Sequence, residues 1–485
     1  MPRCGDEPYQ KLRLRVPDLV ATACLESVMA GWFARLTGRA PPKPAAVAAS
    51  SPAVLAQAAI AVAAGPTASL PALQTPAPTF GVRRPLVGTK GNVAGFELLL
   101  PPALELRLAQ RADAAAGMAR AANQALLLAA AAPLCQTGKR VLMTMGASAL
   151  ARPGVAQQAT AGALICVPDL ALLPPQVAAD LRARGVRLGV SDGPPAMAPA
   201  ADFVLLQAVA GGLDTLLLAA QGWRTQRAPL PLLASGLQHL DDVERVLRAG
   251  FTLVGGVLDR GQSQPAPREL SAAAHRICEL INHLGLDHDT HLVSAAVRGD
   301  VALSYRLLRY ANSPAVGLRQ TVDSVDTAVM LLGRQELHRW LSVLLLSVAD
   351  SRQASRALQE MALARGRLLE RLATLRGHPA PQTLFTMGLL SLLEVLLQVP
   401  LAAALAPLRL PNPVLLALLK REGPLAEYLA LAKALDAGDS ASIELLADAF
   451  GGQEVVQDLA DQAWLWASEV AVSSAPERDA AAGVR

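Results

Sequence analysis

Apolar residues recur with the period of an α-helix through the second half of the chain. Between residues 307 and 349 this pattern predicts three consecutive helices. The third helix places Leu337, Leu341 and Leu344 on one face at spacings of four and three residues. Each helix has a wide apolar face and would not be stable alone, so we expect the three to pack together in a bundle.

The ends of these helices are marked by residues that stop or start a helix. The first helix ends at Asn312, Ser313 and Pro314, because asparagine tolerates the left-handed conformation and proline cannot continue the hydrogen-bond ladder. Ser324 is a suitable N-cap for the second helix, and Gly333 ends that helix. The third helix begins directly afterwards.

A different pattern fills residues 80–256, where short apolar runs alternate with stretches of helical period. Strands that alternate with helices of about 10–15 residues predict βαβ units around a parallel sheet. Their repetition favours an α/β fold of the TIM-barrel type, with some elements trimmed. The predicted strands are Phe80–Pro85, Val93–Leu99, Arg140–Met145, Ala163–Val167, Val186–Val190, Phe203–Leu206, Leu230–Leu233 and Phe251–Val254.

Composition divides the chain further. Residues 1–79 are rich in alanine and proline and cannot bury enough apolar surface to offset the entropy of ordering, so we predict a disordered N-terminal region. Within it, Met29 is an alternative start of translation. We assign residues 80–261 to the barrel and residues 268–472 to an all-α helical domain. Residues 473–485 are expected to form a disordered tail.

The charge balance argues against nucleic acid as a partner. The 44 basic and 40 acidic residues leave a net charge of +4, which is too small a basic excess to indicate a phosphate-binding surface. Residues 322–346 can also be drawn as a helix-turn-helix. Its second helix offers Arg334, Gln335 and Arg339 and then becomes apolar, so we interpret it as part of the core.

Cysteine usage and the apolar stretches indicate a cytoplasmic protein. The five cysteines lie far apart and form no CxxC pair, which favours a reducing compartment. The apolar stretch 388–410 is long enough to cross a bilayer, but Glu394, Pro400 and Pro407 interrupt it. Because a carboxylate is costly at the middle of a bilayer, we predict a buried helix pair and no membrane span.

A short signature in the helical half is similar to a known family. Residues 307–314 read LLRYANSP, and they are followed in order by VDSV at 322–325 and LLG at 331–333. This order resembles the signature of the HDOD domain, an all-helical relative of the HD phosphohydrolases that lacks their metal-binding residues. The resemblance continues at 385–394 and 415–425. It implies regulatory work in bacterial signal transduction through contacts with signalling proteins that the sequence does not identify.

The barrel half carries a second resemblance. Residues 93–99, VAGFELL, are similar to the opening motif of EAL domains, the barrel phosphodiesterases that linearise cyclic di-GMP. Taken together, the two resemblances describe an EAL barrel fused to an HDOD domain, over residues 80 to about 470. Weaker anchor points of the EAL pattern follow in order at 182–186, 191–193, 201–204 and 234–237.

The EAL resemblance also implies where metal ligands would lie. An EAL phosphodiesterase uses two divalent metals, held by carboxylates, an Asn and a Lys at the strand ends. Two carboxylates survive, Glu97 and Asp192, and they cannot hold a two-metal cluster unaided. We therefore predict a degenerate barrel with no catalytic residue, metal or cofactor. The corresponding positions in this chain are Glu97, Thr144, Ser191, Asp192, Leu205, Gln207, Ser235 and Gly255.

A cluster of histidines and aspartates at residues 275–291 invites a metal interpretation as well. His288 and Asp289 form a literal HD dipeptide, but they lie where a helix starts, and Asp289 is a sensible N-cap. Ligands must converge in space rather than in sequence, so we interpret the cluster as a solvated helix entry.

These observations lead to one prediction of function and two alternatives. We predict a non-enzymatic, cytoplasmic signalling protein that acts through protein contacts of its HDOD domain and its inactive EAL-like domain. One alternative is a cyclic di-GMP receptor that binds without hydrolysis. The other is a barrel with residual cyclic di-GMP phosphodiesterase activity.

Overall fold

The protein is described by a computed structural model. The disordered region predicted at 1–79, the connector before residue 269 and the residues after 474 lie outside the described part of the chain. All described residues belong to one compact unit, residues 76–485. They are residues 82–111, 114–191, 201–208, 212–226, 230–259, 269–285, 290–313, 316, 321–348 and 352–474.

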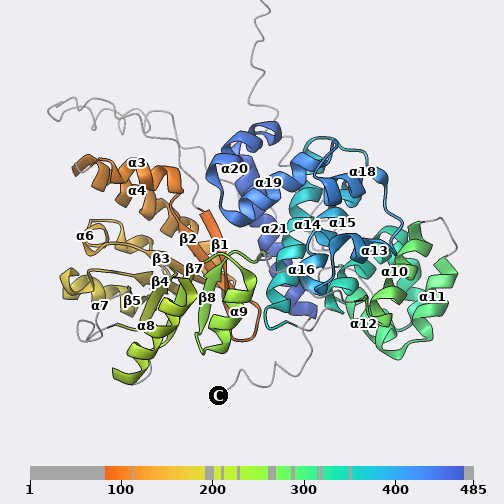
Figure 1. Ribbon diagram of the computed structural model, residues 1–485, viewed down its shortest axis with the longest axis horizontal. Helices are drawn as coiled ribbons and strands as arrows, with labels where there is room; N and C mark the ends of the chain where they lie inside the picture. The colour runs from red at the N-terminus through yellow and green to blue at the C-terminus, as the bar shows by residue number, and fades with distance from the viewer. Residues whose placement is uncertain are drawn as a thin grey trace, which may run out of the picture. The chain divides into compact units, whose positions relative to one another are not determined.

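Eight strands form a closed barrel in which neighbours in sequence are neighbours in the sheet (Figure 1). The strands from β2 to β8 pair in parallel, as the alternation of strands and helices predicts. The α/β barrel is thereby confirmed. The strands are β1 (Val82–Gly88), β2 (Val93–Leu99), β3 (Arg140–Thr144), β4 (Ala163–Cys166), β5 (Arg187–Ser191), β6 (Phe203–Gln207), β7 (Leu232–Leu237) and β8 (Leu253–Gly256).

Strand β1 corrects the expectation of a wholly parallel sheet, because it runs antiparallel to both β2 and β8. A tight turn joins β1 to β2, in which the Gly91 N–H donates to the Gly88 carbonyl oxygen at 2.8 Å. Parallel strands need a crossover of a dozen or more residues, so this short link connects antiparallel strands. Strands β7 and β8 begin at Leu232 and Leu253, slightly later than predicted.

The described chain contains all eight strands of the closed barrel. Helices cover the outside of the barrel (Figure 1). They are α3 (Pro102–Ala109), α4 (Ala114–Ala130), α5 (Ala132–Gln136), α6 (Ala147–Leu150), α7 (Pro175–Ala183), α8 (Gly212–Gln226) and α9 (Leu240–Arg248).

Apolar side chains fill the inside of the barrel. Phe203 is the largest of them, and its ring lies against Gly189 on the neighbouring strand β5. A Cβ atom at residue 189 would lie 2.2 Å from that ring, so the interior accommodates Phe203 only because residue 189 is glycine. The interior cluster consists of Leu86, Leu142, Leu164, Cys166, Phe203, Leu205 and Leu233.

The second half of the described chain is helical, as predicted. Its helices are α10 (Ala272–Gly285), α11 (Thr290–Arg298), α12 (Val301–Ala311), α13 (Val325–Ser347), α14 (Ser355–Leu375), α15 (Pro381–Leu390), α16 (Leu393–Leu397), α17 (Leu401–Leu405), α18 (Asn412–Leu415), α19 (Ala426–Ala437), α20 (Ser440–Ala447) and α21 (Gln453–Ser474). A π-helical segment, Leu416–Lys420, follows α18. The boundaries 80–261, 268–472 and 473–485 assigned from composition stay predictions.

Glycines shape two of these helices. Gly333 has φ 68° and ψ 175°, so α13 consists of two helical pieces that meet at this residue, which confirms the predicted break. Gly366 in α14 faces Gly388 in α15, where a Cβ atom at residue 388 would lie 2.6 Å from the Cα of Gly366. This close approach is how helices with few large side chains bury their backbones against each other.

The apolar stretch 388–410 is divided among α15, α16 and α17 rather than folded as a helix pair. Gln398 separates α16 from α17 in a left-handed conformation with φ 57°. Within the described ranges, we find no helix whose length and hydropathy suffice to cross a membrane.

Buried polar contacts join the barrel to the helices. Lys139, which precedes β3, donates from Nζ to Oε1 of Glu360 in α14 at 2.6 Å. The same oxygen accepts a hydrogen bond from Ser468 of α21 at 2.6 Å, and Glu360 is only 2% exposed. At a second point, Nε of Arg352 lies 3.3 Å from Oε1 of Glu244 in α9. The two halves of the described chain therefore share a polar, desolvated contact.

The β1–β2 turn contacts the start of α14. The Ala357 N–H donates to the Gly91 carbonyl oxygen at 2.8 Å. Gly91 has φ 71°, and a Cβ atom there would lie 1.8 Å from the carbonyl oxygen of Gln353. Glycine is thus required at residue 91 both by its backbone conformation and by the close approach of the helix.

Candidate functional site

Glu97 on β2 points into the barrel and is 2% exposed. Its Oε1 accepts a hydrogen bond from the hydroxyl of Ser235 on β7, across the interior. Its Oε2 has no hydrogen-bond partner among the described residues. Burial raises the pKa of the Glu97 carboxyl group, while the Ser235 hydrogen bond and the charge of Arg84 act in the opposite direction. The site therefore holds a carboxyl group whose ionised form is poorly solvated.

Gly255 on β8 completes the surroundings of Glu97. A Cβ atom at residue 255 would lie 3.1 Å from Oε2 of Glu97 and 3.0 Å from the side chain of Leu86. Any larger residue at 255 would compete with Glu97 for the same space. The structure thus brings together three of the positions that the EAL resemblance marks: Glu97, Ser235 and Gly255.

The other marked positions are spread around the carboxyl ends of the strands. Leu205 on β6 is fully buried and belongs to the interior cluster, which also contains Cys166 on β4. Thr144 and Ser191 end β3 and β5 and are half-buried, and Gln207 ends β6 and is exposed. Asp192 lies outside the described residues.

The described residues at this site do not fit a two-metal centre. One oxygen of Glu97 is already taken by Ser235, and the neighbouring interior positions are leucines and Cys166. No group of three or more His, Cys, Asp or Glu side chains within the described ranges is arranged to hold a metal ion. Two-metal sites need several convergent oxygen ligands, so we derive no reaction step through metals here.

The histidine cluster is split by the structure. His275 and His283 lie on α10, and His291 lies on α11. His288 and Asp289 fall outside the described residues, and α11 begins at the next described residue, Thr290. The position of Asp289 as a helix N-cap therefore stays a prediction.

The predicted signature in the helical half has a structural role. The side chain of Asn312 donates from Nδ2 to the Leu308 and Val322 carbonyl oxygens at 2.8 and 2.7 Å. Its Oδ1 accepts from the Val322 N–H at 2.8 Å. Asn312 thus ties the end of α12 to the residue that leads into α13. Ser324 caps α13 by accepting from the Thr327 N–H at 3.2 Å, as predicted.

The next two signature residues, Ser313 and Pro314, add no side-chain hydrogen bond that the structure describes. Ser313 has a buried hydroxyl with no hydrogen-bond partner in the described structure. Pro314 lies outside the described residues. Among the described signature residues, Asn312 therefore supplies the side-chain contacts between the end of α12 and Val322.

The family model of the HDOD domain matches residues 269–403. Residues 269–403 form an HDOD domain. The match begins just before α10 and ends within α17, so it includes the whole signature from Asn312 to Gly333. Helices α18 to α21 lie beyond it. The resemblance stated from the sequence is thereby confirmed for the HDOD domain.

Comparison with known proteins gives matches longer than the stretch that the HDOD family model covers. The chain is 26% identical over 276 residues to the cyclic di-GMP phosphodiesterase CdgJ of Vibrio cholerae, which covers 56% of this chain and 63% of the relative. It is 28% identical over 215 residues to the uncharacterized protein YuxH of Bacillus subtilis, covering 43% of this chain and 52% of the relative. The chain thus spans between half and two thirds of the length of each relative.

Among solved structures, the EAL domain protein of Listeria monocytogenes matches with a TM-score of 0.28 and 13% identity. The match covers 36% of this chain and 85% of that one.

These comparisons overturn one prediction. We expected a protein that is not an enzyme, but the chain is similar over more than half of its length to a named phosphodiesterase. We inferred from the missing metal ligands that the protein is not an enzyme. That inference was wrong, because it rested on comparing short motifs position by position. That the barrel is degenerate stays a prediction.

Sequence reasoning missed the partner of Glu97 and the role of β1. Ser235 was marked only as a lost ligand, whereas the structure shows it donating to Glu97. Arg83 and Arg84 were not singled out, although two adjacent arginines in a predicted strand must point to opposite faces. Arg84 pairs with Glu97 in the β1–β2 register, and Arg83 contacts Asp461 of α21. The adjacent pair was the signal available in the sequence.

Proposed function

We propose that this protein acts in cyclic di-GMP signalling, in the cytoplasm of a bacterium. The observation that carries the proposal is the similarity to CdgJ over 276 residues in a chain that combines a closed eight-stranded barrel with an HDOD domain. The three described cysteines, Cys135, Cys166 and Cys278, have free thiols, which supports a reducing compartment.

We place the nucleotide-facing site at the carboxyl ends of the strands, around Glu97. Ligands of barrel proteins bind at this end, where loops from different strands meet. Glu97 supplies a buried carboxyl group with one unpaired oxygen, and Ser235 fixes its orientation. A carboxyl group with a raised pKa is suited to hold or release a proton near a phosphodiester.

The test uses the full chain with cyclic di-GMP in the presence of Mg²⁺ or Mn²⁺. Chromatography of the products measures linear dinucleotide, and calorimetry measures binding. We expect Glu97→Gln to abolish turnover and to weaken binding. The matched control is Glu279→Gln, which changes an exposed glutamate on α10. Absence of both turnover and saturable binding in the unaltered chain would refute the proposal.

We also propose that the HDOD domain passes the signal to a protein partner. Val301 and Tyr305 lie one turn apart on α12 and are 85% and 58% exposed. We expect Val301→Asp and Tyr305→Asp to reduce capture of that partner from a host lysate. Leu218→Asp on α8 of the barrel, which is 68% exposed, is the matched control. Equal capture by all four proteins would contradict this role of α12.

A further inference from the structure

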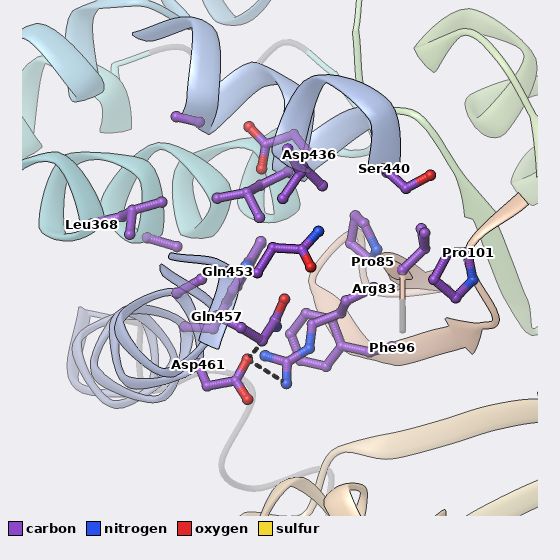
Figure 2. Close-up of a pocket in the computed structure, with 18 of the residues that line it drawn as sticks. Arg83, Pro85, Phe96, Pro101, Leu368, Asp436, Ser440, Gln453, Gln457 and Asp461 are labelled. Atoms are coloured by element: carbon purple, nitrogen blue, oxygen red, sulfur yellow. Dashed lines mark hydrogen bonds and ion pairs between the residues drawn. The ribbon is translucent and has the colours of Figure 1, made fainter. Parts of the chain in front are cut away.

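A cavity of about 290 Å³ lies where the barrel meets the last helices (Figure 2). One wall comes from β1, β2 and α3 of the barrel. The other wall comes from α14, α19, α20 and α21. The cavity is separate from the barrel interior that holds Glu97, because neither Glu97 nor Ser235 lines it.

Arg83 on β1 is the most unusual residue of this cavity. Its side chain is 11% exposed, and its Nη2 lies 2.6 Å from Oδ1 of Asp461 on α21. Its Nε and Nη1 are buried and have no partner among the described residues. Figure 2 shows the guanidinium group beside the ring of Phe96, whose centroid is 5.2 Å from Cζ. Buried donors without partners are rare in proteins, so these two N–H groups point to an acceptor that a ligand would supply.

The charges around the cavity decide what kind of ligand it suits. Arg365 is already satisfied, because Asp436 accepts from its Nε and Nη2 at 3.0 and 2.6 Å. The remaining basic and acidic groups are equal in number, so a ligand with a net charge would gain no overall attraction. The ionised side chains that line the cavity are Arg83, Arg107, Arg365, Asp436, Glu444 and Asp461.

The hydrogen-bonding groups also favour a ligand with both donors and acceptors. Arg83 offers unpaired donors directly beside the carboxylate of Asp461, whose Oδ1 lies 2.6 Å from Nη2 of Arg83 and accepts from Nε2 of Gln457 at 2.9 Å. Figure 2 shows the amide of Gln453, which carries both kinds of group, extending into the cavity. The edge of a heterocyclic base presents an acceptor next to a donor in the same way, and arginine and carboxylate side chains read such edges. The remaining lining is largely apolar, as in other small-molecule sites.

We infer that this cavity binds a small uncharged heterocycle of nucleoside size, which accepts hydrogen bonds from Arg83 and donates to Asp461. The barrel supplies Arg83 and α21 supplies Asp461, so one ligand contacts both halves of the described chain. Its binding strengthens their contact. This site is independent of the nucleotide site proposed around Glu97.

The experiment is calorimetric titration of the full chain with guanosine, adenosine, cytidine and uridine, each used separately, and with inorganic phosphate. We expect saturable binding of at least one nucleoside and none of phosphate. Arg83→Met and Gln453→Met should each weaken that binding at least tenfold. Arg245→Met, which alters an exposed arginine on α9 outside the cavity, should leave it unchanged.

Two results would overturn the inference. One is the absence of saturable nucleoside binding, or its persistence at full strength in both Arg83→Met and Gln453→Met. The other is preferential binding of phosphate, which would indicate an anion site. Should Arg83→Met fail to fold, Gln453→Met carries the test, since it changes a partly exposed residue at the start of α21. Glu97→Gln should not affect nucleoside binding, so this result is separable from the test of cyclic di-GMP signalling.

Discussion

The contact between Lys139 and Glu360 offers the sharpest test of how the two halves of the chain depend on each other. The exposed fractions of the two side chains are 14% and 3%, so solvent screens this ion pair weakly. Lys139→Met keeps the length and apolar stem of the side chain but removes its charge. Glu360 then stays buried with the hydroxyl of Ser468 as its remaining partner at that oxygen.

Removing one member of a buried ion pair costs about 3–5 kcal/mol, because the other charge is left uncompensated. We therefore expect Lys139→Met to lower the free energy of unfolding by about that amount. Replacing both residues, in Lys139→Met with Glu360→Leu, should recover most of the loss, since apolar groups of similar volume often replace buried pairs at little cost. The exposed pair Arg298–Asp326 is the matched control, and Arg298→Met should change the free energy of unfolding far less than Lys139→Met does.

The measurement is urea unfolding of the full chain, followed by far-ultraviolet circular dichroism and analysed for all four proteins at the same pH. A loss below about 1 kcal/mol in Lys139→Met would show that Glu360 is solvated and that the contact is not desolvated as described. A double variant as unstable as the single one would show that Lys139 acts mainly through contacts other than Glu360, such as the hydrogen bond from its Nζ to the Val93 carbonyl oxygen at 2.6 Å.

Three further outcomes are expected. Burial raises the pKa of Glu97 above its ordinary value of 4.5, so its contribution to stability is present at acid pH and is lost as the pH rises. Glu97→Gln should therefore raise the urea midpoint at pH 8 and have little effect on it at pH 4. Gly189→Val should lower the free energy of unfolding by at least about 1–3 kcal/mol, because the new side chain displaces the Phe203 ring. Gly117→Ala in α4, where a Cβ atom meets nothing within 4 Å, should raise the free energy of unfolding by about 0.5–1 kcal/mol. Equal melting temperatures for the two variants would contradict this. Asn312→Ala should lower the free energy of unfolding by about 1 kcal/mol and speed hydrogen exchange at the Val322 amide, which loses its acceptor. Unchanged exchange at that amide would refute the role of Asn312.

Local patterns in the sequence were sufficient for much of the fold. The strands, the helical half, the break at Gly333 and the cap at Ser324 all follow from signals within a few residues, and the structure contains them. The direction of β1 was missed because the alternation of strands and helices says nothing about the first link. That link is a short turn with no helix, and the turn alone determines an antiparallel pair.

The candidate site could be predicted only in part, because its contacts join distant residues. Motif positions located Glu97, Ser235 and Gly255 separately, but barrel closure is what places them side by side. The pairing of Arg83 with Asp461 depends on how α21 packs against β1, and no local pattern encodes it. Counting lost metal ligands also led to a wrong statement about enzyme class, which similarity to a relative corrected.

The contact between Gly91 and α14 has a consequence for biosynthesis. The hairpin that closes the barrel leaves the ribosome early, yet the backbone groups that cover it belong to Gln353 and Ala357. During translation the β1–β2 turn of the nascent barrel stays uncovered until a further 260 or so residues have been made. A gene fragment that stops after β8 would lack the residues that cover this turn, and it would be a poor choice for producing the barrel by itself.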